Sequence, residues 1–252
     1  MHTLIISDIH ANRAALEAVL DREHSWDKVV FLGDAVLAGP EPDEVLSLLR
    51  ELDGICIMGN HDKEVLELEV DEHTIDPGRK WAQWHRRSIS DKNLEFLASF
   101  AEECVLEIQG LAVKAIHGVM PSEFGKRLWP DSPLEAFQCL GHKHAEPCIL
   151  LGHSHVQFDC MRGNTRFINP GSVGAPYLGQ PLACYAAIQN GQVELRATPY
   201  DVEKTCQSMR ERAQGVVDHD FIADWTEGWR TGTLPKRYFI RDYSQLREQG
   251  YR

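Results

Sequence analysis

Three short apolar segments of this sequence end in polar residues at a regular interval. Asp8 follows the apolar segment 3–6, and Asp34 and Asn60 follow two further segments of the same kind. The interval is identical in both cases, since 34 − 8 = 26 and 60 − 34 = 26. A strand, a helix and two loops together take up about this length of chain. The spacing therefore predicts parallel strands joined by right-handed crossovers, with three oxygen-bearing side chains at one edge of a sheet.

The segments between these strands have the periodicity of amphipathic helices. Apolar residues recur at helical spacing over 11–20 and over 42–52, and Pro42 suits the first turn of the second helix. Residues 3–58 are therefore predicted to be β-α-β-α-β. Beyond residue 157 the pattern is rich in strands, with a hairpin signal at 190–191. Together these patterns indicate an α/β fold with two facing sheets and helices outside them.

Imidazoles occupy comparable positions along the chain. His10 lies two residues after the first aspartate, His117 ends another apolar segment, and His153 and His155 follow the apolar segment 148–152. Taken singly, each would be an ordinary polar residue at the end of a strand. Taken together, carboxylate, amide and imidazole groups gathered from several strand ends are what a two-metal hydrolytic site requires.

Composition narrows the class of protein. The chain has 252 residues, 43% hydrophobic and 25% charged, as expected for one soluble α/β domain with or without a small appendage. A net charge of −12 argues against a broad phosphate-binding face, so nucleic acid is not an expected partner. Seven scattered cysteines without a CxxC pair predict free thiols in a reducing compartment. With neither a signal peptide nor a membrane span in the pattern, we expect a cytoplasmic protein.

Two regions lack strand-end motifs. Residues 63–100 look largely helical and contain Trp81 and Trp84, so this insert is expected to be either a lid over the site or a helix pair with its tryptophans packed inward. Residues 201–252 are expected to form a helical extension packed on a catalytic domain that spans 1–200.

Five motifs now stand in order along the chain. They are Asp8-x-His10, Gly33-Asp34, Gly59-Asn60-His61-Asp62, His117-Gly118 and Gly152-His153-Ser154-His155. This series resembles the signatures of the calcineurin-like metallophosphoesterases, and 169–174 resembles the loop that follows in their compact bacterial and archaeal phosphodiesterase branch. The resemblance covers residues 1–200. It implies a double β-sheet sandwich flanked by helices, a four-layer α/β/β/α fold that agrees with the pattern of strands and helices described above.

The resemblance also implies an activity and a set of ligands. The expected reaction is hydrolysis of phosphate mono- or diesters by a metal-activated hydroxide at two divalent ions. Oxygen and nitrogen ligands without thiolate suit Mn, Fe, Zn, Co or Ni, and Mn is expected because the family often uses it. Carried over by motif, the ligands of the first ion would be Asp8, His10, Asp34 and His155. Those of the second ion would be Asp34, Asn60, His117 and His153, with Asp34 bridging the two.

His61 would act on the leaving group rather than bind a metal. The resemblance gives it the role of general acid, which protonates the leaving alkoxide or stabilises its charge. Asp62 is adjacent in the sequence, and a neighbouring carboxylate would raise the pKa of the imidazole, so Asp62 is also expected to take part in catalysis.

Several nearby residues have two interpretations each. Asn12, Arg13, Asn169 and Ser172 lie close to the motifs, and they either contact the site or serve as caps and turn residues. Lys126 and Arg127 could attract phosphate, but they are interpreted as a solvated basic pair.

Two other functions are considered beside hydrolysis of a small cytosolic phosphoester. One branch of the family uses this fold as a protein-interaction scaffold and has lost key site residues, whereas His61 and every ligand position are intact here. A nuclease is the other alternative, and the net negative charge of the chain counts against it. The sequence does not indicate the oligomeric state.

Overall fold

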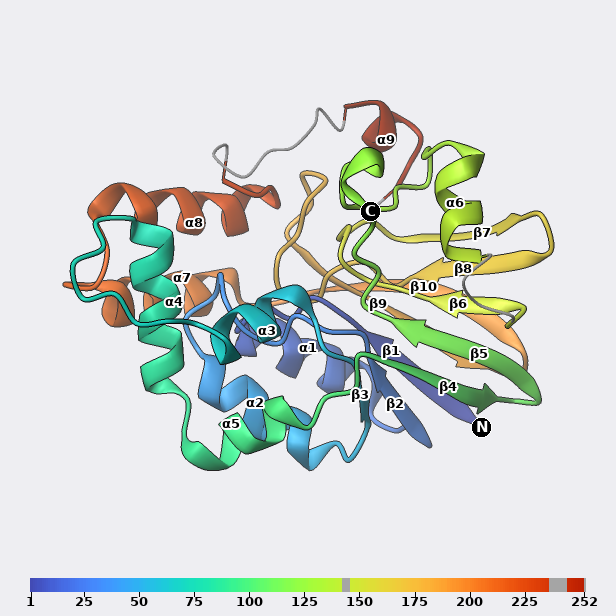
Figure 1. The fold of residues 1–252 in the computed structure, drawn as a ribbon, viewed down its shortest axis with the longest axis horizontal. Helices are drawn as coiled ribbons and strands as arrows, with labels where there is room; N and C mark the ends of the chain where they lie inside the picture. The colour runs from blue at the N-terminus through green and yellow to red at the C-terminus, as the bar shows by residue number, and fades with distance from the viewer. Residues whose placement is uncertain (142–145, 236–243, 252) are drawn as a thin grey trace.

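The computed structural model describes residues 1–141, 146–235 and 244–251 (Figure 1). Within these residues, two five-stranded sheets face each other. The first sheet has the order β10-β9-β1-β2-β3, in which β1, β2 and β3 are parallel as the spacing predicts. Its strands are β1 (His2–Ile6), β2 (Lys28–Phe31), β3 (Ile55–Cys56), β9 (Leu182–Gln189) and β10 (Gln192–Pro199).

The second sheet has the order β4-β5-β6-β8-β7. Its three central strands are parallel, and both edge strands are antiparallel to their neighbours. The strands are β4 (Glu103–Ile108), β5 (Leu111–Ile116), β6 (Cys148–Leu150), β7 (Phe158–Arg162) and β8 (Thr165–Asn169). The carboxyl ends of the parallel strands in both sheets carry the loops that hold the sequence motifs.

The central strands are buried on both faces, which explains their continuous apolar sequences. In β1, Ile5 belongs to the core between the sheets, while Leu4 and Ile6 face the helices on the other side. The same alternation holds in β2, where Val30 faces the second sheet and Phe31 faces the helices.

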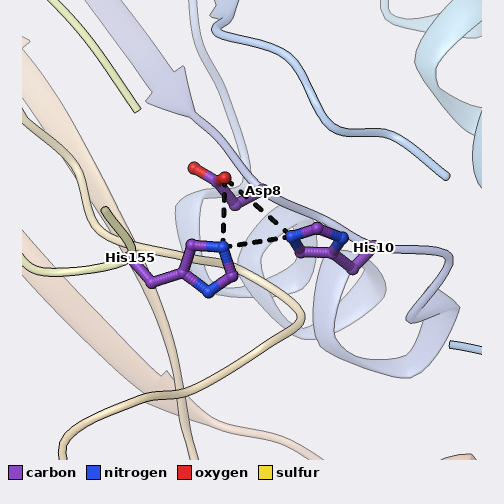
Figure 2. A group of neighbouring side chains, drawn as sticks. All are labelled: Asp8, His10 and His155. Carbon is purple, nitrogen blue, oxygen red and sulfur yellow. Dashed lines mark hydrogen bonds and ion pairs between the residues drawn. The ribbon is translucent and has the colours of Figure 1, made fainter. Parts of the chain in front are cut away.

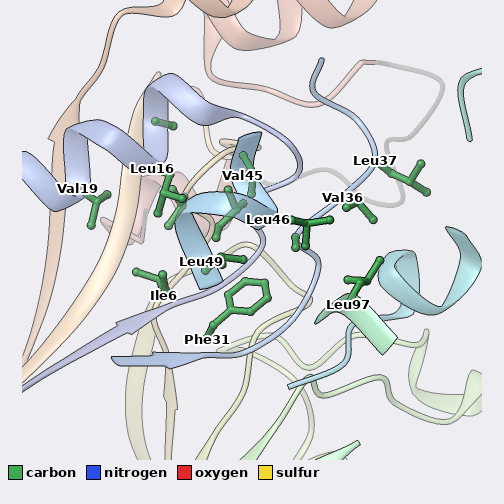
Figure 3. Close-up of a cluster of buried hydrophobic side chains, with 14 of the residues drawn as sticks. Ile6, Leu16, Val19, Phe31, Val36, Leu37, Val45, Leu46, Leu49 and Leu97 are labelled. Carbon is green, nitrogen blue, oxygen red and sulfur yellow. The ribbon is translucent and has the colours of Figure 1, made fainter. Parts of the chain in front are cut away.

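Helices cover the outer face of each sheet, so the four-layer prediction is confirmed. Helices α1 (Arg13–Glu23) and α2 (Pro42–Glu51) pack on the first sheet, with α5 (Asp91–Ala98) beside them. Figure 3 shows Leu46 and Leu49 near Phe31 in this layer, with Leu16 and Leu97 in the same cluster. The helix α6 (Leu134–Gly141) packs on the outer face of the second sheet.

The remaining helices lie at the end of the molecule near the strand-end loops. They are α3 (Asn60–Leu66), α4 (Pro77–Ser88), α7 (Val202–Ala213) and α8 (His219–Thr231), with a short α9 (Ser244–Glu248) further on. Figure 1 shows α4 beside α8, and the rings of Trp81 and Phe221 join them at 6.2 Å. Trp229 of α8 donates a hydrogen bond of 3.0 Å to the carbonyl of Gly174, which ties α8 to the main body. Across the described ranges, none of the helices has the length and apolar character needed to cross a bilayer.

Candidate metal centre

The loops that leave β1 and β2 lie side by side and bring the first two motifs together. The backbone N–H of Asp8 donates to the carbonyl of Gly33, and that of His10 donates to the carbonyl of Asp34, each at 2.9 Å. These hydrogen bonds continue the ladder of the two strands beyond the sheet. As a result, the side chains of Asp8 and Asp34 emerge at one edge.

One buried group consists of Asp8, His10 and His155. Figure 2 shows the three side chains directed toward one another. The Nε2 atoms of His10 and His155 lie 3.1 Å apart, and Nε2 of His155 lies 3.3 Å from Oδ1 of Asp8. The candidate ligand atoms all lie within 4.8 Å of one another, which is close enough for a single cation.

A second buried group consists of Asp34, His117 and His153. Nε2 of His117 lies 3.2 Å from Oδ2 of Asp34 and 3.1 Å from Oδ1 of Asn60. The same Asp34 oxygen lies 3.9 Å from Nε2 of His10, which belongs to the first group. Asp34 therefore contacts both groups, and the two form one centre.

Each carboxylate has one oxygen held by the protein and one directed into the centre. Oδ2 of Asp8 accepts hydrogen bonds from the Ser7 hydroxyl at 2.6 Å and from the His153 backbone N–H at 3.0 Å. Oδ1 of Asp34 accepts the backbone N–H of His61 at 2.8 Å. The other oxygen of each carboxylate, and Nε2 of His153, are buried without a hydrogen bond from any described residue. Buried polar atoms are normally paired, so these three atoms fit a bound cation.

Two of the histidines have a defined tautomer. Nδ1 of His117 lies 2.7 Å from the carbonyl of Leu32, and Nδ1 of His155 lies 2.9 Å from the carbonyl of Ala175. A carbonyl only accepts, so both Nδ1 atoms carry a proton and both Nε2 atoms face the centre. This is the usual outer support of a metal-binding histidine.

The charges in the centre favour a cation. Burial would raise the pKa of Asp8, but the attraction of His155 outweighs it and holds that pKa below its ordinary value. Burial lowers the pKa of His10 to about 3 and that of His153 well below its ordinary range, so both are neutral imidazoles. Burial also opposes the charged form of His117, yet the negative charge of Asp34 raises its pKa to about 9, so a cation bound at its Nε2 would displace a proton. The carboxylates thus create a negative site surrounded by nitrogen donors.

Backbone strain is concentrated at the same positions. Asp8, His10, Asp34, His153 and His155 have φ values of 53°, 50°, 61°, 66° and 62°. Residues other than glycine rarely adopt this region, and such conformations cluster at functional sites. Five of the seven predicted metal ligands therefore hold a costly conformation, which the surrounding loops enforce.

His61 lies at the edge of the centre and is about one-third exposed. Its ring centroid is 5.4 Å from that of His10, and its Nδ1 lies 3.0 Å from a carboxylate oxygen of Glu64. Burial would lower the pKa of His61, but the charge of Asp34 and the hydrogen bond with Glu64 raise it. The carboxylate that pairs with this imidazole is thus Glu64, three residues along α3, which is a spacing that brings two side chains together on a helix.

Asp62, which the sequence predicts beside His61, makes a different set of contacts. Its Oδ2 accepts the backbone N–H groups of Asp34 and Gly59 at 2.8 and 2.9 Å, and its Oδ1 accepts that of Ala35 at 2.8 Å. The side chain is fully buried. Through these bonds Asp62 joins the start of α3 to the loop that carries Asp34.

Residues that the sequence left open support the loops of the centre. The Ser172 hydroxyl donates to the carbonyl of Asp8 at 2.7 Å, and the Asn169 amide donates to the carbonyl of Gly152 at 2.8 Å. Oδ1 of Asn12 accepts a backbone N–H at the start of α1, and its amide donates to Gly174. These contacts are those of caps and turn residues.

Arg127 differs from the interpretation as a solvated residue. Its Nε donates to the carbonyl of His153 at 3.2 Å, and its side chain lines a cavity of about 420 Å³ together with His10, His61 and His155. The cavity extends to α4 and α8. The metal centre therefore opens into a cavity whose wall carries the positive charge of Arg127 and the carboxylate of Glu64.

Comparison with known proteins places these features in a family. The family model of the calcineurin-like phosphoesterase superfamily domain matches residues 1–191. The chain is 31% identical to an uncharacterized protein of Methanocaldococcus jannaschii in an alignment of 225 residues, and the match covers 81% of this chain and 90% of that protein. A solved metallophosphoesterase from Sphaerobacter thermophilus is 27% identical, with a TM-score of 0.75, over 92% of this chain and 99% of that one.

A hypothetical protein of Pyrococcus horikoshii shares the fold, with a TM-score of 0.76 and 19% identity over 89% of this chain and 97% of that one. The match to the family model covers well over half of the sequence and includes every residue of the two buried groups. This chain belongs to the calcineurin-like phosphoesterase superfamily, and it is a hydrolase of the metallophosphoesterase type with two candidate metal sites.

Proposed function

We propose that the protein hydrolyses a phosphoester bond of a small substrate at two divalent metal ions. The observation that carries the proposal is Oδ2 of Asp34, a buried oxygen without a hydrogen bond from the described chain that contacts a histidine of each group. An oxygen in this position suits a ligand shared between two cations.

The two groups have the donors that this arrangement needs. Asp8, His10, His155 and Asp34 would hold one ion, and Asp34, Asn60, His117 and His153 would hold the other. Manganese is the ion we propose, because oxygen and nitrogen donors without thiolate suit it. When bound, the two ions would supply acidification of a water and neutralisation of phosphate charge. All seven cysteines are free, in keeping with the cytoplasmic location that we propose.

His61 would supply the proton to the leaving group. Its ring lies beside the centre and is partly exposed to the cavity, and Glu64 orients it through Nδ1. The charges of Glu64 and Asp34 favour the protonated form, which is the form that an acid needs. Asp62 would act through Asp34 and α3, as a positioning residue.

The test uses protein loaded with Mn and two substrates, bis-p-nitrophenyl phosphate and p-nitrophenyl phosphate. Metal-dependent release of nitrophenol is expected, and the two rates give the preference between diester and monoester. The variant His61→Ala is expected to keep its metal content and lose about 100-fold or more in kcat. The variant Asp34→Asn is expected to lose metal on elemental analysis.

His219 is a suitable control, because its side chain is 93% exposed and remote from the motifs in sequence. The variant His219→Ala should match the wild type in both assays. An inert wild-type protein with two bound ions would contradict hydrolysis and favour the scaffold alternative. An undiminished rate in His61→Ala would remove the acid role from this residue.

A further inference from the structure

We infer that the phosphoester carries an aromatic group, and that α4 and α8 bind this group beside the metal centre. The inference rests on the proposed function, because it assigns the organic part of the same substrate. It concerns the cavity of about 420 Å³ that His10 and His155 line at the metal centre.

The cavity has a polar side and an apolar side. Its polar side chains are His61 and Glu64, Arg127, and the two metal-centre histidines already named. The rest of the lining is glycine or apolar, and its large members are Trp81 of α4 with Phe221 and Trp225 of α8. A phosphate at the metal centre would therefore have its organic substituent against aromatic rings.

Apart from the indole N–H of Trp225, the aromatic wall offers little to a polar substituent. The indole N–H of Trp81 is already donated to the carbonyl of Ala38 at 3.1 Å, and Phe221 and Leu234 have no polar side-chain atoms. A sugar or a charged group placed here would lose several hydrogen bonds to water and find few replacements. An aromatic ring would instead gain burial and ring-to-ring contacts.

The wall is held rigidly in place. Trp81 stacks on Trp84 with ring centroids 4.4 Å apart and planes inclined by 2°, and Trp81 also contacts Phe221 at 6.2 Å. Trp81 is 2% exposed and Phe221 is 1% exposed. Pre-organised aromatic surfaces lose little conformational entropy on binding, which makes them effective anchors.

The wall also comes from parts of the chain outside the shared catalytic motifs. Helix α4 lies within the insert 63–100, and α8 begins at His219, beyond the residues 1–191 that match the family model. The ligand residues belong to the five motifs, whereas α4 contains none of these motifs and α8 lies beyond the family model. This separation between the metal ligands and the aromatic wall fits a wall that selects the organic group of the substrate. Arg127, on the same cavity, supplies a charge complementary to the phosphate.

Two phosphonates test the inference by binding rather than turnover. Methylphosphonate and phenylphosphonate have the same charged head and differ only in the organic group, and neither is hydrolysed as an ester. Isothermal titration of the Mn-loaded protein should give a Kd for phenylphosphonate at least about 10-fold lower than that for methylphosphonate, as expected for burial of a ring.

Variants of the cavity residues then test where the preference for the aromatic phosphonate arises. In Trp225→Ala the ratio of the two Kd values is expected to fall to about 3 or less, since one side of the wall is removed. Phe221→Leu removes a ring from the same helix and should reduce the ratio less strongly, and it serves as the deciding variant if Trp225→Ala does not fold. Ile222→Ala is the matched control: Ile222 belongs to the same helix and packs on the same core cluster without lining the cavity. It should keep the wild-type ratio, with folding of all variants checked by thermal melts.

The possible results of these binding measurements have different consequences. Equal affinity of the wild type for the two phosphonates would overturn the inference while leaving the metal centre in place. A folded cavity variant with an unchanged ratio would overturn the assignment to α4 and α8. Failure of both phosphonates to bind a protein that holds two ions would instead overturn the proposed function, and the inference with it.

Discussion

Replacing Asp62 by asparagine is expected to destabilise the fold and to empty the metal centre at the same time. Oδ2 of Asp62 accepts two backbone N–H groups, and Oδ1 accepts that of Ala35 at 2.8 Å and that of Val36 at 3.2 Å. Burial and the charge of Asp34 raise the pKa of Asp62 to about 6, so at pH 8 the side chain is an ionised acceptor.

The magnitude follows from these four hydrogen bonds. Whichever way the asparagine amide is turned, its NH₂ group faces two backbone donors that lose their acceptor. A buried donor without a partner costs about 1–3 kcal/mol, so the free energy of unfolding should fall by about 4 kcal/mol. This is a large part of the about 5–15 kcal/mol that stabilises a typical domain. Since two of the donors are Asp34 and Gly59, the loop that carries the shared ligand should shift as well.

Urea unfolding followed by circular dichroism at pH 8, with Mn content measured on the folded protein, checks both effects. Glu64→Gln is the matched control, because it neutralises a carboxylate of the same helix whose side chain is 49% exposed. It should change the free energy of unfolding by about 0.5 kcal/mol or less. If Asp62→Asn unfolded like the wild type and kept its metal while losing turnover, Asp62 would be a catalytic group and the positioning argument would be refuted.

Three further outcomes are expected. Glu23 has a side chain that is 4% exposed, and although burial opposes it, hydrogen bonds from Tyr185 and Arg196 hold its pKa below the ordinary 4.5. Its contribution to stability is therefore complete above about pH 4.5 and lost as the pH falls below that value. In urea unfolding, Glu23→Gln should lower the free energy of unfolding by about 3 kcal/mol at pH 7, and this loss should shrink toward pH 3. A difference that does not depend on pH would contradict this expectation. The backbone angles of Gly59 suit any residue, but in Gly59→Ala the new Cβ would meet the backbone nitrogen and Oδ1 of Asp34. The Mn content should therefore fall. Full metal occupancy would show that the loop can move to accept the methyl group. Added Mn at 100 times its Kd should stabilise the metal-free protein by about 3 kcal/mol, seen as a rise in Tm, and an unmoved Tm would argue against a folded-state site.

Much of the metal centre could be predicted from the sequence, because its ligands come directly after strands. A residue just after a buried parallel strand has its position fixed by the sheet, so the interval of 26 residues could place Asp8, Asp34 and Asn60 at one edge. The two facing sheets were predictable from β-α-β units followed by a segment rich in strands.

Contacts that depend on how helices dock could not be predicted in this way. Glu64 reaches His61 only because α3 begins at Asn60, which sets the register of the helix. Asp62 lies next to His61 in the sequence, yet the same register directs it to the backbone of the Asp34 loop. Arg127 lies in a loop and contacts the His153 carbonyl, and no periodic pattern in the sequence predicts such a contact.

The metal centre and the aromatic wall are connected through one loop. Gly174 donates its N–H to the carbonyl of Asp8, and its own carbonyl accepts both the Asn12 amide and the indole N–H of Trp229. Its neighbour Ala175 accepts Nδ1 of His155 and lines the cavity. A displacement of α8 therefore acts on the support of two metal-centre residues, whose positive φ angles need that support. Because the same loop anchors the wall and restrains these strained residues, substitutions in α8 that change the choice of organic group must keep the Trp229 bond, or they alter the metal centre together with it.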